Sequence, residues 1–345
     1  MAPPRRRRPT QVDIAKRAGV SQATVSLVLS GGAVSDQIAE STRQAVLAAA
    51  TELGYSVNVA ARSLKRGRNH LLGLYTFEPV FPTDQRDFYF PFLLGVEEET
   101  ARQGYDLLLF SSVTAGDRAI YSGGVNRLKL ADGCVLLGRN VRREELAELV
   151  REDFPFVFIG RRELEDAELS YVAADYVTAT SDLVGELVRL GHRRILYLRA
   201  PGDTEPTLDR EQGYRQGLAA AGITEPLIRK LTDPDELTQL QDWLATTGAT
   251  AVLVEPSEDA SLVTALDALS GVRFPQDCSI ALLGDPPSWT PELRDWTRFS
   301  LPRAEMARTA VQLLVELLAE PGLKQVTVPC LFVAGDSIGA APTQS

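Results

Sequence analysis

The chain has little cysteine and histidine and no long apolar run. Its 345 residues include three cysteines and two histidines, and no cysteines form a CxxC pair. An odd, sparse set argues against structural disulfides and zinc sites and favours a reducing compartment. No run of about 18 apolar residues is present, so no membrane span is expected. The charged N-terminus lacks the apolar segment of a signal peptide, which predicts a cytoplasmic protein.

Catalytic fingerprints are also missing. The sequence has no GxSxG, P-loop, HExxH or dinucleotide-binding motif. His192 fits a structural turn and His70 stands at a segment boundary, so neither indicates acid–base chemistry. A catalytic pair of carboxylates stays open, because no spacing singles one out. We therefore expect no enzyme activity, no cofactor and no metal.

Charge is distributed unevenly along the chain. Residues 1–70 carry eleven Lys/Arg against four Asp/Glu, whereas the whole chain has 36 against 46 and a net charge of −10. A basic head on an acidic body is typical of a nucleic-acid-binding module joined to a part that does not bind nucleic acid. The length predicts two or three domains.

The stretch from Val12 to Gly31 is typical of two short helices joined by a tight turn. Thr10 and Asp13 are spaced as a capping box for the first helix. Gly19 can adopt the positive φ of the turn, and Ser21 is placed as N-cap of the second helix. The apolar residues at helical spacing, which predict the inner face, are Ile14, Ala15, Ala18, Val25, Val28 and Leu29.

The outer face of the second helix suits DNA. In a helix-turn-helix, the N-terminal residues of the second helix meet base edges in the major groove. Gln22 can pair bidentately with adenine, and Ala23 and Leu27 can contact thymine methyl groups. Three hydroxyl residues suit phosphate oxygens: Ser21, Thr24 and Ser26. From spacing alone, an ordinary helical hairpin stays an alternative.

The segment AGVSQATVSLVLS resembles the signature of the lactose-repressor (LacI/GalR-type) family of bacterial transcription regulators. The resemblance continues through ELGYSVNVAARSLKRG into the rest of the chain. By position, Gln22, Ala23 and Leu27 match the family's base-reading sites. Many members have Arg in place of Leu27, so we expect a guanine contact to be lost and the operator to differ. The resemblance implies a homodimer on double-stranded operator DNA in the bacterial nucleoid, with repression as the default sign.

A third helix is predicted from Ile38 to Leu53 and ends at Gly54. Arg43, near its start, is a candidate for a phosphate contact. The predicted inward stripe is Ala45, Val46, Ala49 and Leu53. Residues 1–9, MAPPRRRRP, form a basic arm that either is a disordered tail or lies along phosphates or in the minor groove.

Asn58 caps a predicted helix of two turns, which is too short to be stable alone. The resemblance implies a hinge helix that orders on DNA and inserts an apolar wedge into the minor groove, and Leu64 stands at the wedge position. Ala61 matches a small residue in the groove, and Arg62 and Lys65 can reach phosphates. A plain linker stays an alternative.

From Leu71 onward, apolar strand-like runs alternate with helical stretches. Strands are predicted at Leu71–Tyr75, Tyr105–Phe110, Gly133–Leu137, Phe156–Ile159, Arg194–Leu198, Ala251–Val254 and Ser279–Leu283. Helices are predicted at Leu93–Gln103, Arg142–Arg151, Ser181–Leu190, Arg210–Ala221, Glu236–Thr246 and Ala260–Leu269. The alternation predicts parallel sheets with helices on both faces. About 275 residues exceed one core, so two subdomains are expected.

The predicted fold class is a small all-α helix-turn-helix DNA-binding domain plus an α/β, periplasmic-binding-protein-like effector domain of two parallel-sheet subdomains. The expected parts are a headpiece (1–57), a hinge (58–69) and a body for effector binding and dimerisation (70–345). The resemblance implies three chain crossings, which we expect near Gly191, Trp296 and Lys324. Subdomain N then covers about 70–191 and 297–323, and subdomain C about 192–296 and 324–345.

Ligands of open parallel sheets bind at the carboxyl ends of strands, so an effector cleft is expected between the subdomains. Arg210 matches a family arginine, at a helix start, that reaches the ligand; a surface salt bridge is the alternative. Asp285 matches a cleft aspartate that accepts hydrogen bonds from ligand hydroxyls, with loop capping as the alternative. Asp175 is a weaker candidate at another strand end.

Aromatic residues near these positions are also candidates. Trp289 could stack on a sugar, although core packing explains it equally well. Phe88 and Phe92 could line the cleft, but plain core is the favoured interpretation. Ser257 stands where the family usually has Asp, and Gly335 where it often has Arg, so the effector need not be a common hexose. The leading hypothesis is a sugar or sugar derivative; the rivals are a DNA-binding regulator without an effector and a DNA-tethered enzyme.

Overall fold

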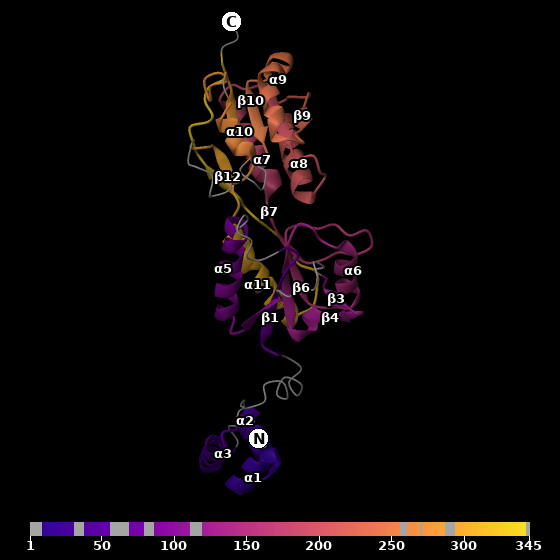
Figure 1. Cartoon of the computed structure of the whole chain (residues 1–345), viewed down its shortest axis with the longest axis vertical. Coiled ribbons are helices and arrows are strands. Elements are labelled where there is room, and N and C mark those ends of the chain that lie inside the picture. Colours follow the sequence, from indigo (N-terminus) through magenta and orange to yellow (C-terminus); the bar gives the residue numbers. More distant parts are fainter. Residues whose placement is uncertain are drawn as a thin grey trace, which may run out of the picture. The chain divides into compact units, whose positions relative to one another are not determined.

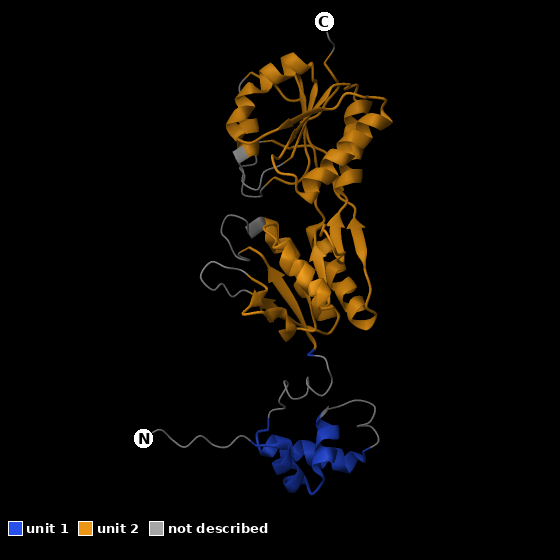
Figure 2. Ribbon diagram, turned by 90° about the vertical axis from the view of Figure 1, so that its right-hand side faces the viewer, with its two compact units in different colours: residues 1–69 blue, residues 70–345 orange. Residues whose placement is uncertain are grey.

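The computed structural model describes residues 9–30, 38–55, 69–78, 86–110, 119–255, 261–269, 271–286 and 294–342. The chain divides into two compact units, residues 1–69 and residues 70–345, which Figure 2 shows in blue and orange. Five proposed hinge contacts fall outside the described residues: Asn58, Ala61, Arg62, Leu64 and Lys65. The basic arm 1–8 falls outside them as well.

The described part of the first unit contains three helices, α1 (Gln11–Ala18), α2 (Gln22–Ser30) and α3 (Glu40–Glu52). The predicted capping box is confirmed: the Thr10 hydroxyl accepts from the Asp13 N–H at 3.4 Å, and the Thr10 N–H donates to the Asp13 carboxylate at 2.8 Å. Gly19 has φ 66°, as the turn requires. The small core joins all three helices through Ile14, Ala15, Val25, Val28, Val46, Ala49 and Ala50.

The prediction for α3 was wrong in two details. The helix begins at Glu40, two residues after Ile38, and Ala45 is exposed. Ala50 takes the buried place beside Val46 and Ala49. A helix advances 3.6 residues per turn, so an inward stripe built on Val46 continues through Ala49 and Ala50.

The first sheet of the second unit is parallel, in the strand order β13-β7-β6-β5-β1-β2. Its strands are β1 (Leu71–Thr76), β2 (Asp106–Phe110), β5 (Gly133–Leu137), β6 (Phe156–Ile159), β7 (Tyr171–Ala174) and β13 (Gln325–Val328). Alternate residues face opposite cores: Val135 packs with α5 (Arg86–Arg102) and α11 (Arg303–Ala319), and Leu136 packs on the side of α6 (Arg143–Arg151). A short hairpin, β3 (Tyr121–Ser122) and β4 (Val125–Asn126), precedes the 3₁₀ helix η2 (Arg127–Leu130).

The second sheet has the order β14-β12-β11-β10-β8-β9 and is parallel except for β14, which pairs antiparallel with β12. Its strands are β8 (Ile195–Arg199), β9 (Leu227–Lys230), β10 (Ala251–Val254), β11 (Ser279–Leu282), β12 (Arg298–Ser300) and β14 (Leu331–Val333). One core packs against α7 (Tyr176–Arg189) and α8 (Glu205–Ala220). The other packs against η3 (Pro234–Gln239), α9 (Leu240–Thr247) and α10 (Ser261–Asp267). Figure 1 shows these helices on both faces of the sheet.

Several predicted helices have different bounds. Helices α5, α7 and α8 all begin at least five residues earlier than predicted. Arg210 therefore lies in the second turn of α8 rather than at its start. The stretch predicted as one helix from Glu236 to Thr246 is divided into η3 and α9. The prediction missed α11 and the short strands β9, β12, β13 and β14. Each of these strands has only three or four residues, which is too few for a period-2 pattern to be distinctive.

The first crossing between the sheets lies earlier than predicted. It follows β7 at Asp175, because α7 packs on the second sheet, whereas the prediction placed it near Gly191. A helix between two parallel strands can pack on the sheet of either strand. The sequence therefore located the helix without revealing to which sheet it belongs.

The other two crossings lie a few residues later than predicted. The second is at Leu301–Pro302, between β12 and α11, and the third is at Pro329–Cys330, between β13 and β14. The expected positions were Trp296 and Lys324. The Asp175 N–H donates to the Val328 carbonyl at 2.9 Å, so the first and third crossings run side by side. Among the described helices, none is long and apolar enough to cross a membrane.

Two glycines test the packing of α7 against α8. In Gly213→Ala, the new Cβ would lie 2.2 Å from the Val177 carbonyl oxygen, so we expect the free energy of unfolding to fall by about 1–3 kcal/mol. Gly185, exposed on α7, has open space, so Gly185→Ala should be neutral or stabilising by up to about 1 kcal/mol. Urea unfolding followed by tryptophan fluorescence measures both, and equal effects would contradict the packing.

Candidate DNA interface and ligand cavity

The outer face of α2 is built by an N-cap and a buried inner stripe. The Ser21 hydroxyl accepts from the Thr24 N–H at 3.1 Å, which fixes the start of the helix. Val25 is fully buried and Val28 is 7% exposed, so these two residues hold the opposite face outward. That outer face presents Gln22 and Ala23, both exposed, together with half-buried Thr24 and Ser26 and with Leu27, which is 39% exposed.

Two ion pairs lie on the surface of the headpiece, one between α1 and α3 and one within α3. Arg17 of α1 donates to Glu52 of α3 through two nitrogens, at 2.6 and 2.9 Å. Arg43, the proposed phosphate contact, donates to Glu40 one turn before it, at 2.5 Å. Both side chains of the second pair are exposed, so a phosphate competes only with a solvent-screened partner.

A cavity of about 600 Å³ lies between the two sheets of the second unit. In each sheet the strand order reverses beside its first strand, β1 or β8, and strands at this switch point end at the cavity. The lining includes Gly138 and Arg139 after β5, Ala200 after β8 and Glu255 after β10. Its apolar lining comes from α5, α7 and α11, as Phe88, Tyr89, Phe92, Tyr176 and Met306. This is the predicted kind of location for a ligand.

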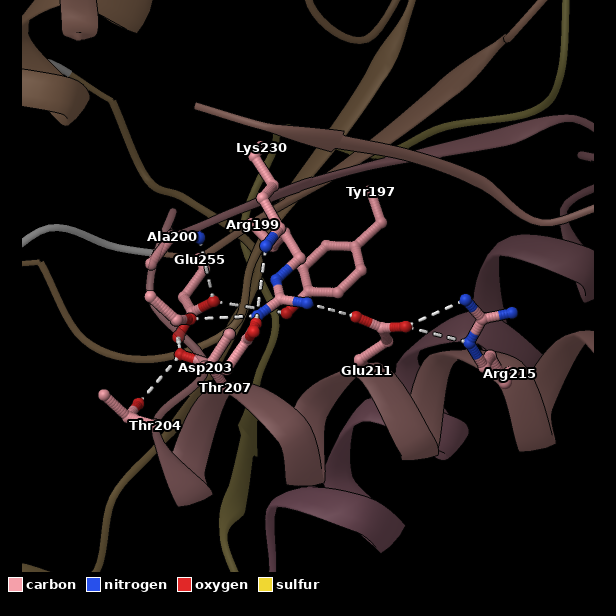
Figure 3. Close-up of polar contacts among 11 residues, drawn as sticks. Tyr197, Arg199, Ala200, Asp203, Thr204, Thr207, Glu211, Arg215, Lys230 and Glu255 are labelled. Carbon is pink, nitrogen blue, oxygen red and sulfur yellow. Dashed lines mark hydrogen bonds and ion pairs between the residues drawn. The ribbon is translucent and has the colours of Figure 1, made fainter. Parts of the chain in front are cut away.

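Glu255 forms the polar floor of the cavity on the side of the second sheet. Its carboxylate accepts from the Thr207 hydroxyl at 2.7 Å, the Ala200 N–H at 3.1 Å and the Tyr197 hydroxyl at 3.2 Å, as Figure 3 shows. Burial, and then the charge of Glu255, raise the pKa of Tyr197, so its hydroxyl stays a donor. Beside this group, Arg199 donates to Asp203, Glu211 and the Gly202 carbonyl.

Arg210 completes that floor. Its Nη1 donates to Glu255 at 3.0 Å and its Nε to the Leu283 carbonyl at 2.9 Å, and its Cζ lies 4.1 Å from the ring centre of Tyr176. The side chain lines the cavity but is 7% exposed. Arg210 therefore lines the cavity and forms a buried ion pair rather than a surface one, and its contact with a ligand stays a prediction.

Asp285 also lines the cavity, at the end of β11. Its carboxylate accepts from the Leu301 N–H at 3.1 Å and forms ion pairs with Arg298 at 3.4 Å and Arg303 at 3.3 Å. Phe88 lines the opposite wall and also packs on the core, and its ring lies 5.1 Å from the Arg303 guanidinium and 5.4 Å from that of Arg139.

Three other candidates take no described part in the cavity. Asp175 caps α7, where its carboxylate accepts from the Thr178 N–H at 3.0 Å, and it is not among the described residues that line the cavity. Ser257 and Trp289 fall outside the described residues. His192 is fully buried, with Nδ1 2.8 Å from the Thr250 hydroxyl and Nε2 3.0 Å from the Gly339 carbonyl, in a structural position.

Sequence reasoning missed a group of arginines in the cavity. They follow the adjacent strands β5 and β6, each of which ends in Gly-Arg, as LLGRN and FIGRR. Parallel neighbours end at the same edge of a sheet, so this repeated dipeptide was a usable signal. It brings Arg139, Arg161 and Arg162 to the cavity.

Ion pairs bridge the two sheet subdomains at the cavity mouth. Arg161, after β6, donates to Asp209 of α8 through two nitrogens, at 2.6 and 3.3 Å. Arg143 of α6 pairs with Glu205, at the start of α8, at 2.7 Å. The first partner of each pair belongs to the subdomain of the first sheet and the second partner to that of the second sheet, so these pairs link the two subdomains beside the cavity. No cluster of metal ligands occurs in the described part of the chain.

Three family models match the chain. "Bacterial regulatory proteins, lacI family" matches residues 10–58, and "Periplasmic binding proteins and sugar binding domain of LacI family" matches residues 78–246. "Periplasmic binding protein-like domain" matches residues 184–338. Together the models cover both units of the structure.

Individual proteins match along most of the chain. The HTH-type transcriptional regulator CelR of Thermobifida fusca is 32% identical over 330 residues, which cover 90% of this chain and 92% of that protein. A solved "transcriptional regulator CelR-cellobiose complex" is 26% identical, with a TM-score of 0.59, over 96% of this chain and 100% of that one. A lac repressor dimer bound to operator and the anti-inducer ONPF has a TM-score of 0.69 over 97% and 100%; at 20% identity it shows the fold alone.

The buried Glu255 gives a stability prediction. Glu255→Ala removes the acceptor of three neutral donors and leaves the Arg210 guanidinium without its carboxylate, so we expect a loss of about 3–5 kcal/mol in the free energy of unfolding. Urea unfolding of the full chain measures it. The matched control is Glu186→Ala on α7, which removes the partner of exposed Arg189 and should change little. If both variants are equally stable, Glu255 is not the anchor of this floor.

Proposed function

Since the chain belongs to the LacI family of bacterial regulatory proteins and is a DNA-binding transcriptional regulator, we propose that a small carbohydrate or carbohydrate derivative in the cavity switches its affinity for operator DNA. The observation that carries this proposal is the cavity of about 600 Å³ at the switch points of both sheets. Aromatic side chains and buried hydrogen-bonding groups line it together, which is the chemistry that sugars require.

On the DNA side, the protein works as a homodimer, because two half-sites require two headpieces. Gln22, Ala23 and Leu27 contact base edges, while Ser21, Thr24, Ser26 and Arg43 contact phosphates. In the hinge, Leu64 is the minor-groove wedge, Ala61 lies in the groove, and Asn58, Arg62 and Lys65 support it. The default outcome is repression, in the bacterial cytoplasm where the operator is.

The effector acts by changing the balance between open and closed bodies. A ligand shifts a conformational equilibrium only by its difference in affinity for the two states. A ligand enclosed between the sheets contacts both subdomains only when the cavity is closed. The pairs Arg161–Asp209 and Arg143–Glu205 favour the same closed state without a ligand. Ligand and ion pairs therefore act in the same direction.

Base reading by α2 gives one test. Gln22→Ala should weaken binding to the protein's own selected operator by about 5- to 150-fold, because a bidentate adenine contact contributes about 1–3 kcal/mol. Fluorescence anisotropy at one fixed salt concentration measures this, with random-sequence DNA alongside. Gln44→Ala on exposed α3 is the matched control and should leave the affinity unchanged. Equal losses on operator and random DNA would mean that Gln22 reads no base.

The closing ion pairs give a second test. Asp209→Asn should shift the ligand-free operator affinity by about 2- to 10-fold, in the direction opposite to the shift that the effector causes, because it disfavours the closed state. The control is Asp203→Asn, since both partners of Asp203, Arg199 and Lys230, belong to the second subdomain. A shift in the same direction as that of the effector contradicts the proposed coupling.

A further inference from the structure

Arg162 occupies an unusual place in the cavity wall. Its Nη1 donates to the Arg161 carbonyl at 2.6 Å and its Nη2 to the Gly138 carbonyl at 2.7 Å, and its Cζ lies 4.7 Å above the Phe158 ring. The side chain folds over Gly160, where an added Cβ would lie 3.1 Å from Nη1. Gly160 has φ 108°, which favours glycine. The turn is thus shaped to hold this guanidinium at the ends of β5 and β6.

Most charged groups of the cavity lining are paired with one another. The described lining contains six arginines and four carboxylates. The arginines are Arg139, Arg143, Arg161, Arg162, Arg210 and Arg303. Each carboxylate already has an arginine partner, in the pairs Arg143–Glu205, Arg161–Asp209, Arg210–Glu255 and Arg303–Asp285. A fifth carboxylate, that of Glu78, lies beside this lining, where it accepts from the Arg139 and Asn140 N–H groups at 2.9 and 2.7 Å.

Arg162 stands outside these ion pairs. The described residues give it two carbonyl acceptors and no carboxylate. Burial lowers its pKa, which reflects the cost of holding a cation away from water. Two acids oppose this shift: Glu205, which is engaged with Arg143 and with the Glu163 N–H, and Glu78, which accepts from the Arg139 and Asn140 N–H groups. A guanidinium has five N–H donors, so Arg162 keeps donors that two carbonyls do not use.

We propose that the cavity is specific for an acidic carbohydrate, one that bears a carboxylate or a phosphate, and that Arg162 pairs with that anionic group. This inference rests on the proposed function of the cavity and adds the chemical class of the effector. A neutral sugar hydroxyl can accept one hydrogen bond from Arg162, but it leaves the buried charge uncompensated. An anionic oxygen pair supplies the missing charge and matches the planar fork of the guanidinium.

The rest of the cavity suits the remainder of such a ligand. Phe88 and Tyr176 offer ring faces for the apolar face of a sugar, although guanidiniums lie near both rings. Thr204 and Thr207 on α8 bring hydroxyl groups to the opposite side. The sugar ring therefore has partners on both subdomains, while the acid group is read from the first subdomain alone.

The test compares neutral and acidic probes of matched size on the full-length protein. Isothermal titration uses cellobiose against cellobionate, and glucose against glucuronate and glucose 6-phosphate. We expect an acidic member to bind at least about 10-fold more tightly than its neutral counterpart. The comparison of glucuronate with glucose 6-phosphate shows whether the cavity binds a carboxylate or a phosphate more tightly. If a neutral sugar binds and no acidic partner binds more tightly, the inference is wrong while the proposed function stands.

Variants assign the effect to Arg162. Arg162→Gln should weaken the acidic probe by about 10- to 100-fold and leave the neutral probe within about 3-fold, and Arg162→Lys should restore part of the loss. Arg151→Gln, an exposed arginine on α6, is the matched control and should alter neither. Equal losses on both probes would overturn the role of Arg162. If no sugar binds the wild-type protein and none changes its operator affinity, the proposed function fails together with this inference.

Discussion

The carboxylate of Glu255 holds together three elements that form one side of the cavity. Glu255 directly follows β10. Its carboxylate accepts hydrogen bonds from the Ala200 N–H after β8 and from the side chains of Thr207 and Arg210 on α8. A buried charge of this kind persists only when its hydrogen bonds are saturated, so each partner constrains the others. Glu255 thus helps to fix the start of α8 on the second sheet, while farther along the helix the Tyr214 hydroxyl donates to the Ile195 carbonyl of β8. Because Glu205 and Asp209 lie on α8, the bridges to the first subdomain depend in part on Glu255 as well.

The same ion pairs therefore bear on both the closure of the cavity and its selection of a ligand. The four carboxylates of the described lining serve the protein itself, either across the cavity mouth or within a subdomain. Those pairs fix the geometry and at the same time neutralise four of the six arginines. Arg162, after β6 in the first subdomain, stands outside these pairs. A ligand that supplies negative charge there completes an arrangement that the protein leaves positive.

Features held by residues close together in the sequence could be predicted from it, whereas contacts between residues far apart in the sequence could not. The headpiece depends on local signals, such as the Thr10–Asp13 box and the turn at Gly19, and these were confirmed. The alternation of strands and helices in the second unit could also be predicted from the sequence. The positions of the crossings could not, because Asp175 and Gly191 flank a helix that can pack on either sheet. The partners of Arg210 and Asp285 were also hidden, since Glu255 and Arg303 are distant in sequence and only folding brings them near.

Base reading by the headpiece has a physical limit that the structure makes visible. Of the exposed residues on the outer face of α2, only Gln22 carries a side chain that can both donate and accept; Ala23 and Leu27 are apolar. Apolar contact recognises a thymine methyl group but cannot replace the two hydrogen bonds that distinguish guanine. Discrimination by α2 alone is therefore narrow. The remaining specificity must come from contacts outside this helix and from the sequence-dependent shape of the DNA, which is read through the energy needed to deform it.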